Sequence, residues 1–476
     1  MLLAVSLAGA ACLGQAPAPG DEGASPSDAD DTAPPMEPLA AFLASMDATG
    51  HDVREGGVFF STYDGCCDEG AQCFGNNPAT PYGTHVVPTL PDEAPSEDVL
   101  QPWGTLPDPA LTRSVRLRHD EALVYIGRVP PESAYFSVRS YQLAATDEEG
   151  EVVPTIGSLG EPLNHLSIAA ERGVDPSEVW GTPLVVITSA DRAVENRLRA
   201  RLEEAGFDPA HIHADRMTYE VLHMGLDAEA DLYGVVWRVA LPTDEAAGEA
   251  YRDDHGGVVL RVTPRAPREL VAPHPRPSFQ RLGAGTDEEA WTEALDALQA
   301  AILAAYPDAA SLVDTAKPSF QPTLDCLARA RCAGDIRDRM ARVVHDFILE
   351  DDAFVVAFGV NHQRTGKASY SNVAVVEEVH GLGLAGFSSA DMPGSARAFL
   401  PDEPLVDDLF VWMVRRDCSG QTVPCVEVPT GCPGVDPGGR MRVTFRAYLD
   451  PSSGVAPAPW EMRPDRVIKF WSGSLR

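Results

Sequence analysis

The sequence predicts an α+β protein with mostly antiparallel sheets and a few packed helices, built either as one large integrated fold or as two closely packed subdomains. Three observations support this class. Many short apolar runs have the length of strands, few segments have helical spacing, and Gly (40) and Pro (41) residues punctuate the chain. With 476 residues, 44% of them hydrophobic, the chain can bury a substantial core.

The first 12 residues are predicted to be a signal peptide. Residues 2–11 are apolar but too few to span a bilayer as a mature helix. Small residues precede Cys12, which is typical of a bacterial lipoprotein cleavage site, and Cys12 is the predicted lipidated residue. Two features depart from that pattern, because no basic residue precedes the run and Gly9 stands where a larger apolar residue is usual.

Residues 13–38 are predicted to be a disordered tether. They are mostly Ala, Pro, Gly, Ser, Asp and Glu, which leaves little to bury. Signal, tether and later cysteines together predict an exported protein, either anchored at the cell envelope as a lipoprotein or secreted. The only membrane contact expected is through the lipid.

The cysteines also favour an oxidising compartment. Eight remain after Cys12, which suits up to four disulfides. Their positions are Cys66, Cys67, Cys73, Cys326, Cys332, Cys418, Cys425 and Cys432. Proximity favours Cys326 with Cys332, one pair from the last three, and Cys73 with Cys66 or Cys67. The two left over would bridge distant parts of the chain.

The N-terminal α+β region is predicted to cover residues 39–270. It starts from a helix over residues 36–48, and a second helix is predicted from a Ser189 cap to Ala205, ended by Gly206. This helix and its flanking strands predict an α/β unit. The strands expected in this region are 57–60, 122–128, 134–143, 183–188, 211–213, 233–241 and 258–262.

The C-terminal α+β region is predicted to cover residues 271–476. The Pro- and Arg-rich segment 264–278 marks the boundary. Thr286 and Glu289 have the spacing of a capping box, which predicts a helix whose apolar residues dock on a core. The expected strands are 353–361, 369–379, 406–415, 440–449 and 466–471.

The net charge of −34 argues against nucleic-acid and anionic-membrane partners, because no basic block offsets it. Phosphate-loop and dinucleotide fingerprints are missing, so no cofactor is predicted. Of 37 basic residues only Lys317, Lys367 and Lys469 are lysines. A lysine kept in so Arg-rich a chain suggests a position where a planar guanidinium cannot replace an ammonium.

The stretch 361–372 is the strongest candidate site, because it is a dense polar run between two apolar ones. His362, Lys367 and Tyr370 are candidate catalytic groups, since each can move a proton and a desolvated Lys can act as a base. Arg364 and Thr365 are candidate ligand-binding residues. The alternative is a polar hairpin with Lys367 in a structural ion pair.

Two further sets are candidates. Asp335 and Asp338 are spaced by three, so on a helix they would share a face as an acid and base pair; the alternative is ordinary acids at a helix start. Asn164 and His165 are candidate ligand-binding residues.

A third set, His211, His213 and His223, has a His-x-His pattern that puts both rings on one face of a strand, with Asp215 following on that face. No complete metal-ligand motif occurs, so no metal is predicted.

The chain resembles a family of secreted proteins of unknown function from bacteria, fungi and plants. The matching segments are 77–83 (Asn-Pro-x-Thr-Pro-Tyr-Gly), 130–137, 158–165, Cys332 with 334–338, 362–370, 394–396 and 446–449. The resemblance implies one integrated fold and implies no activity.

Two functions follow as hypotheses. The first is an exported, lipid-anchored envelope protein that binds a small molecule, a glycan or an envelope component. The alternative is an extracellular enzyme that acts on a polar or carbohydrate substrate with the 361–372 stretch.

Overall fold

The computed structural model describes residues 36–147, 151–276, 283, 285–319, 326–327, 332, 334 and 336–472. Cys12, most of the predicted tether and Asp335 lie outside these residues. The α+β class is confirmed, because five α-helices accompany three sheets in the described part. No helix there is long and apolar enough to cross a membrane.

The first sheet collects the strands of residues 51–264. Its order is β6-β5-β10-β2-β1-β11-β4-β8-β9, with β3 paired to β2 and β7 paired to β5. All its pairs are antiparallel except β8 with β9. The bounds are β1 (His51–Phe60), β2 (Tyr82–Pro88), β3 (Leu111–Thr112), β4 (Ala122–Arg128), β5 (Ser133–Thr146), β6 (Val152–Ser158), β7 (Leu163–Asn164), β8 (Pro183–Ser189), β9 (Ile212–Arg216), β10 (Leu232–Pro242) and β11 (Val258–Pro264).

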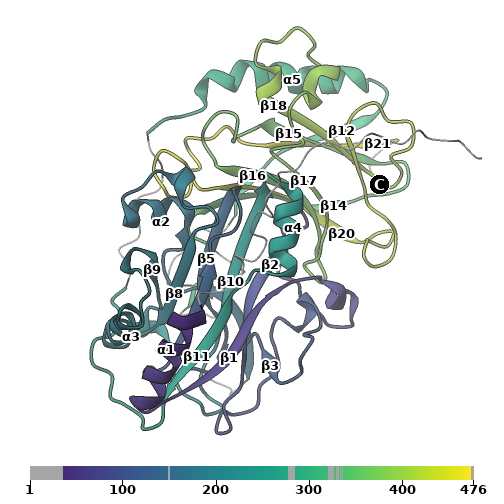
Figure 1. Cartoon of the computed structure of the whole chain (residues 1–476). Coiled ribbons are helices and arrows are strands. Elements are labelled where there is room, and N and C mark those ends of the chain that lie inside the picture. The colour runs from purple at the N-terminus through teal and green to yellow at the C-terminus, as the bar shows by residue number, and fades with distance from the viewer. Residues whose placement is uncertain are drawn as a thin grey trace, which may run out of the picture.

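Two helices cover one face of this sheet. α1 (Met36–Ala48) has the predicted bounds, and α3 (Arg192–Glu204) lies beside it (Figure 1). Phe42, Val194 and Leu198 pack there against apolar side chains of β4, β8 and β11. The parallel pair β8–β9 joined by α3 confirms the predicted α/β unit. Two smaller helices, α2 (His165–Arg172) and α4 (Glu245–Asp253), follow β7 and β10.

The predicted cap of α3 is wrong by two residues. Ser189 ends β8, and the Asp191 side chain accepts the capping hydrogen bond from the Ala193 N–H. The helix ends where expected, because Gly206 follows it with a φ of 103°, a conformation that favours glycine.

The strands of residues 310–471 form two five-stranded sheets. One has the order β12 (Ala310–Thr315), β21 (Arg466–Trp471), β15 (Phe354–Val360), β18 (Leu409–Arg415), β19 (Cys425–Glu427). The other has the order β13 (Lys317–Pro318), β14 (Arg339–Ile348), β20 (Arg440–Tyr448), β16 (Tyr370–Glu377), β17 (Gly383–Ser388). All five strands expected in this region are confirmed.

The two sheets pack against each other, and α5 (Thr292–Ala305) covers the outside of the first (Figure 1). Val355 and Phe410 meet Val373 and Phe445 in the layer between the sheets. Because strand side chains alternate between faces, Val356 and Phe358 point the other way, toward the buried face of α5.

The predicted capping box of this helix is wrong. Thr286 precedes a short 3₁₀ turn that begins at Glu289, and α5 begins only at Thr292. The Thr286 carbonyl instead accepts a hydrogen bond from Lys367, and Glu288 turns inward to His362. Tertiary contacts therefore displace the helix start.

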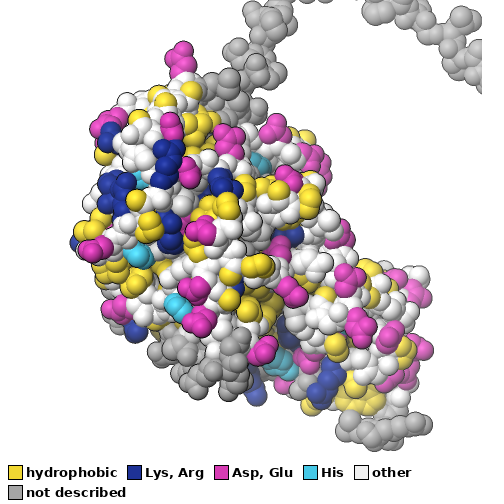
Figure 2. Space-filling view, turned by 90° about the horizontal axis from the view of Figure 1, so that it is seen from below, with side chains coloured by type: hydrophobic (Ala, Val, Ile, Leu, Met, Phe, Trp, Pro, Cys, Tyr) yellow, Lys and Arg dark blue, Asp and Glu magenta, His cyan; other side chains and the backbone are white. Residues whose placement is uncertain are grey.

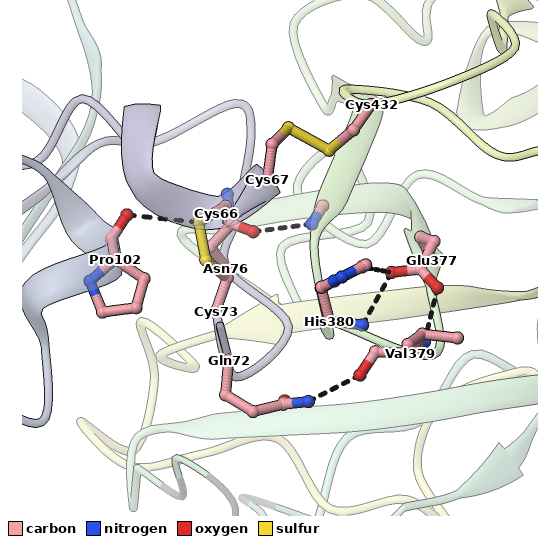
Figure 3. Close-up of a disulfide and its surroundings, with 11 residues drawn as sticks. Cys66, Cys67, Gln72, Cys73, Asn76, Pro102, Glu377, Val379, His380 and Cys432 are labelled. Carbon is pink, nitrogen blue, oxygen red and sulfur yellow. Dashed lines mark hydrogen bonds and ion pairs between the residues drawn. A yellow bond between two sulfur atoms is a disulfide. The ribbon is translucent and has the colours of Figure 1, made fainter. Parts of the chain in front are cut away.

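Four disulfides confirm the predicted pattern. Three are local, Cys66–Cys73, Cys326–Cys332 and Cys418–Cys425, and the leftover pair Cys67–Cys432 joins residues 365 positions apart. The Cys-rich loop also binds the turn before β17, because Gln72 donates to the Val379 carbonyl at 2.6 Å and the Cys73 N–H to the His380 carbonyl at 2.7 Å (Figure 3). The region of the first sheet is thus linked, by a disulfide and by hydrogen bonds, to the two five-stranded sheets.

Candidate functional site

The polar stretch that follows β15 connects two different sheets. β15 pairs with β18 and β21, whereas β16 pairs with β17 and β20. The alternative that this stretch is a hairpin is therefore wrong. The stretch instead crosses from one of the two packed five-stranded sheets to the other, and we call these two sheets the sandwich. Asn361, His362 and Lys367 are buried in this crossing.

Lys367 is held by three acceptors. Its Nζ lies 2.9 Å from the Thr286 carbonyl and 3.0 Å from the Asp450 carboxylate, and it pairs with Glu461. Burial alone would lower the pKa of Lys367, but the hydrogen bonds to Glu461 and Asp450 outweigh it and raise the pKa. The three N–H donors of the ammonium all have partners, so this lysine forms structural ion pairs and hydrogen bonds within the fold.

His362 is a second buried cation. Its Nδ1 lies 2.8 Å from one Glu288 carboxylate oxygen, and its Nε2 lies 3.5 Å from Asp465. Burial acts to lower the pKa of His362, but Glu288 and Asp465 outweigh it and raise the pKa to about 9. The imidazolium is therefore charged at neutral pH and is poorly suited to accept a proton.

The other candidates of this stretch also have protein partners. Thr365 donates to Glu288 at 2.7 Å, and exposed Arg364 pairs with Asp408 at 2.9 Å. The buried Tyr370 hydroxyl lies 3.0 Å from the Thr80 hydroxyl and accepts from the Asn77 amide at 3.2 Å. Burial raises the pKa of Tyr370.

Little space for a ligand exists at this crossing. The cavity beside His362 and Asp465 measures about 10 Å³, room for at most one water. The geometry here therefore supports a structural network, and the candidate catalytic residues of the stretch do not surround a ligand-sized cavity in the described part.

A cavity of about 540 Å³ lies elsewhere, where the first sheet meets the turn after β20. We call it the polar cavity. Its wall combines β5, residues 160–164, the start of α2, the β9 edge, residues 274–276 and residues 454–455, with Asp338 among the lining groups. Its volume lies within the range of ligand pockets, ~300–1,000 Å³.

Asp338 and Asn164, two candidates from separate sets, meet on this wall. The Asn164 amide nitrogen lies 3.5 Å from an Asp338 carboxylate oxygen, and the Tyr135 hydroxyl lies 2.9 Å from both oxygens. Burial raises the pKa of Asp338 to about 6, against the opposing effect of the Tyr135 hydrogen bond. Asp338 can thus exchange a proton near neutral pH.

The capping of α2 fixes the orientation of Asn164. Its Oδ1 accepts from the Ser167 N–H at 2.9 Å, and the Ser167 hydroxyl accepts from the Asn164 N–H at 2.8 Å. With Oδ1 used by the helix, the amide nitrogen faces Asp338. His165 does not line the cavity; it is buried 5.0 Å from the Trp180 ring, and burial lowers its pKa to about 4.

Three arginines line the polar cavity, and each has an acidic partner. Buried Arg139 pairs with buried Asp215. Arg216 pairs with Glu195 at 3.2 Å, and Arg276 pairs with Glu220 at 2.6 Å. These arginines therefore give the wall hydrogen-bond donors but no unpaired positive charge.

These arginines were not among the residues that the sequence singled out. The close approach of Gly160 to Arg139, where a Cβ would lie 2.7 Å from the guanidinium, is visible only in the structure. His274, buried on the same wall, also had no sequence signal; burial lowers its pKa, so its ring is neutral at pH 7.

The His-x-His pattern does not form a shared face. His211 lies in a 3₁₀ turn before β9, whereas His213 is buried and bonded to Glu171. Asp215 pairs with Arg139, and the His223 N–H donates to Asp231. No group of three or more His, Cys, Asp or Glu that could hold a metal ion occurs among the described residues.

No family model matches the chain, and no curated protein does. Solved structures are only distantly similar. An uncharacterised protein from Burkholderia cenocepacia is 12% identical, with 91% of this chain and 86% of that chain covered and a TM-score of 0.35. The tandem N-terminal CBM22 domains of Xyn10C from Paenibacillus barcinonensis are 10% identical, with 90% and 87% covered and a TM-score of 0.14. The family resemblance seen in the sequence stays a prediction.

Proposed function

We propose that the protein binds a small, polar, uncharged molecule in the polar cavity, and that it does so as an exported protein anchored at the cell envelope through Cys12. The observation that carries this proposal is the pairing of all three wall arginines inside a cavity of about 540 Å³. The four disulfides support export.

The charge balance of the wall selects against an anion. An anion entering the polar cavity would have to displace an existing carboxylate from Arg139, Arg216 or Arg276, and Asp338 would repel it when ionised. A neutral molecule with several hydroxyl or amide groups can use the donors and acceptors already present. No Phe, Tyr or Trp side chain lies on the described wall, so hydrogen bonds rather than stacking on a large ring would orient the ligand.

The test compares ligands of one size and three charges. Thermal unfolding of the full chain is measured with a neutral hexose, its uronic acid and its amino sugar. Only the neutral sugar is expected to raise the Tm, because a ligand that binds the native state stabilises it by mass action. A larger rise with the uronic acid would overturn the proposal.

A cavity-filling variant locates the binding. Ala214→Phe adds a ring to the β9 wall of the polar cavity and is expected to abolish the Tm shift. Ala297→Phe, on the exposed side of α5, is the matched control and is expected to keep it. An equal Tm shift in both variants would place the ligand elsewhere.

One observation favours an enzyme as a second candidate. A buried carboxyl with a pKa of about 6 on a cavity wall suits a general acid or base. Under this alternative Asp338, and not His362 or Lys367, exchanges the proton with a polar substrate. Asp338→Asn would then keep binding and lose turnover.

A further inference from the structure

A second cavity, of about 310 Å³, lies beside α3. It is bounded by the C-terminal end of α1, the exposed edge of α3, and the segment after β11. We call it the arginine pocket. Its volume is at the lower end of the ligand-pocket range, ~300–1,000 Å³, which suits a short chain or a single ring.

The floor of the arginine pocket is apolar. Met46, Val194, Leu198 and Val262 line it, and all four are buried among the residues that join α1 and α3 to the sheet. This floor offers van der Waals contact and no hydrogen-bonding group to a ligand.

The rim carries two arginines that lack a carboxylate partner. Within the described part of the chain, neither Arg197 nor Arg268 forms an ion pair, whereas Arg201 on the same rim pairs with Glu204. This is unusual in a chain with 71 acidic and 37 basic residues. Burial and then the charge of Arg268 lower the pKa of Arg197, so the two guanidinium groups lie close enough to repel each other.

Asp191 and Asp120 offset this charge only in part, because they raise the pKa of Arg197 less than burial and Arg268 lower it. Asp120 already accepts from the Arg118 guanidinium at 2.9 Å and from the Arg268 N–H at 2.7 Å. Burial and Arg268 lower the pKa of His51, so its ring adds no negative charge and little positive charge at pH 7. Figure 2 shows Lys and Arg side chains gathered on the left of its view, the side on which Figure 1 places α3, while Asp and Glu are scattered.

We propose that the arginine pocket binds a small carboxylic acid with an apolar chain or ring. The carboxylate would lie between Arg197 and Arg268, because guanidinium groups match carboxylate geometry and an anion relieves their repulsion. The apolar part would lie against Met46, Leu198 and Val262.

The proposal is tested by titration calorimetry of the full chain with three probes. Hexanoate has both features, 1-hexanol has only the apolar chain, and inorganic phosphate has only the charge. Hexanoate is expected to bind with a stoichiometry of one and at least tenfold more tightly than either other probe. Equal binding of hexanol, or no saturable binding of hexanoate, would overturn the proposal.

Matched variants assign the binding to this pocket. Arg197→Gln with Arg268→Gln is expected to weaken hexanoate binding at least tenfold, whereas Arg192→Gln, exposed on the same helix but away from the pocket, keeps it. Ala200→Phe fills the rim without a change of charge and is also expected to abolish binding. Unchanged affinity in the double variant would overturn the proposal.

This inference does not depend on the proposed function. Ala214→Phe, which fills the polar cavity, is expected to leave hexanoate binding unchanged. Loss of hexanoate binding in that variant would show that the acid occupies the polar cavity, and would overturn the inference.

Discussion

Lys367 and Glu461 form an ion pair with 3% and 8% of their side chains exposed, and Asp450 on the same ammonium is fully buried. The pair ties the crossing between the two sheets of the sandwich to the segment before β21. One ammonium therefore faces two carboxylates in a region with little water, where an unpaired charge is costly.

Removing this ammonium should destabilise the fold. Lys367→Met leaves Asp450 and Glu461 without their cation, and a cost of about 3–5 kcal/mol in the free energy of unfolding is expected. Urea denaturation measures it. Lys317→Met, at an exposed position on β13, is the control and should change stability by less than about 0.5 kcal/mol. A Lys367→Met variant as stable as the control would contradict the structural role.

Charging of His362 should make stability depend on pH. Its pKa of about 9 in the folded protein exceeds the unfolded value of ~6.5, so its stabilising contribution is complete below pH ~6.5 and is lost as pH rises through about 9. The difference in unfolding free energy between the wild type and His362→Gln should shrink by roughly 3 kcal/mol over this window. A constant difference for His362→Gln would refute the prediction.

Asp338 should titrate in a lower window. Its folded pKa of about 6 exceeds the unfolded value of ~3.9, so the protonated form is favoured by folding and wild-type stability should fall as pH rises from ~4 to ~6. Asp338→Asn cannot ionise, so it should gain up to roughly 3 kcal/mol relative to the wild type across this window. Parallel stability curves for the two proteins between pH 4 and pH 7 would show that Asp338 is not perturbed.

The long-range disulfide should contribute more than a local one. Cys67–Cys432 closes a separation of 365 residues and Cys418–Cys425 one of 7, which in a chain-entropy model corresponds to upper limits of ~6 and ~2.5 kcal/mol. Replacing each pair by Ala and comparing the Tm measures the difference. A larger loss of Tm for the local pair would mean that these disulfides do not stabilise the fold mainly by restricting the unfolded chain.

Local patterns predicted much of the fold. α1 and β4 have the expected bounds, because apolar spacing and turn residues within the segments themselves decide such elements. Sheet membership was not predicted, since β15 and β16 lie next to each other in sequence but pair with different strands. That choice depends on contacts between residues that are far apart in the chain.

The candidate site was predicted only in part, for the same reason. Asn164 and Asp338 were singled out separately, but they are 174 residues apart and no local pattern joins them. The scarcity of lysine indicated that Lys367 has a special environment, and it does: three acceptors match its three N–H donors. Lys317 shows the limit of that argument, because it is exposed on β13.

The Cys67–Cys432 bond closes most of the described chain into a covalent ring (Figure 3). A protease that cuts once between residues 68 and 431 therefore cannot separate the two products. They would stay together on a non-reducing gel and part only when a thiol is added. The protein can thus be cut once in a surface loop of this ring and keep both of its halves attached.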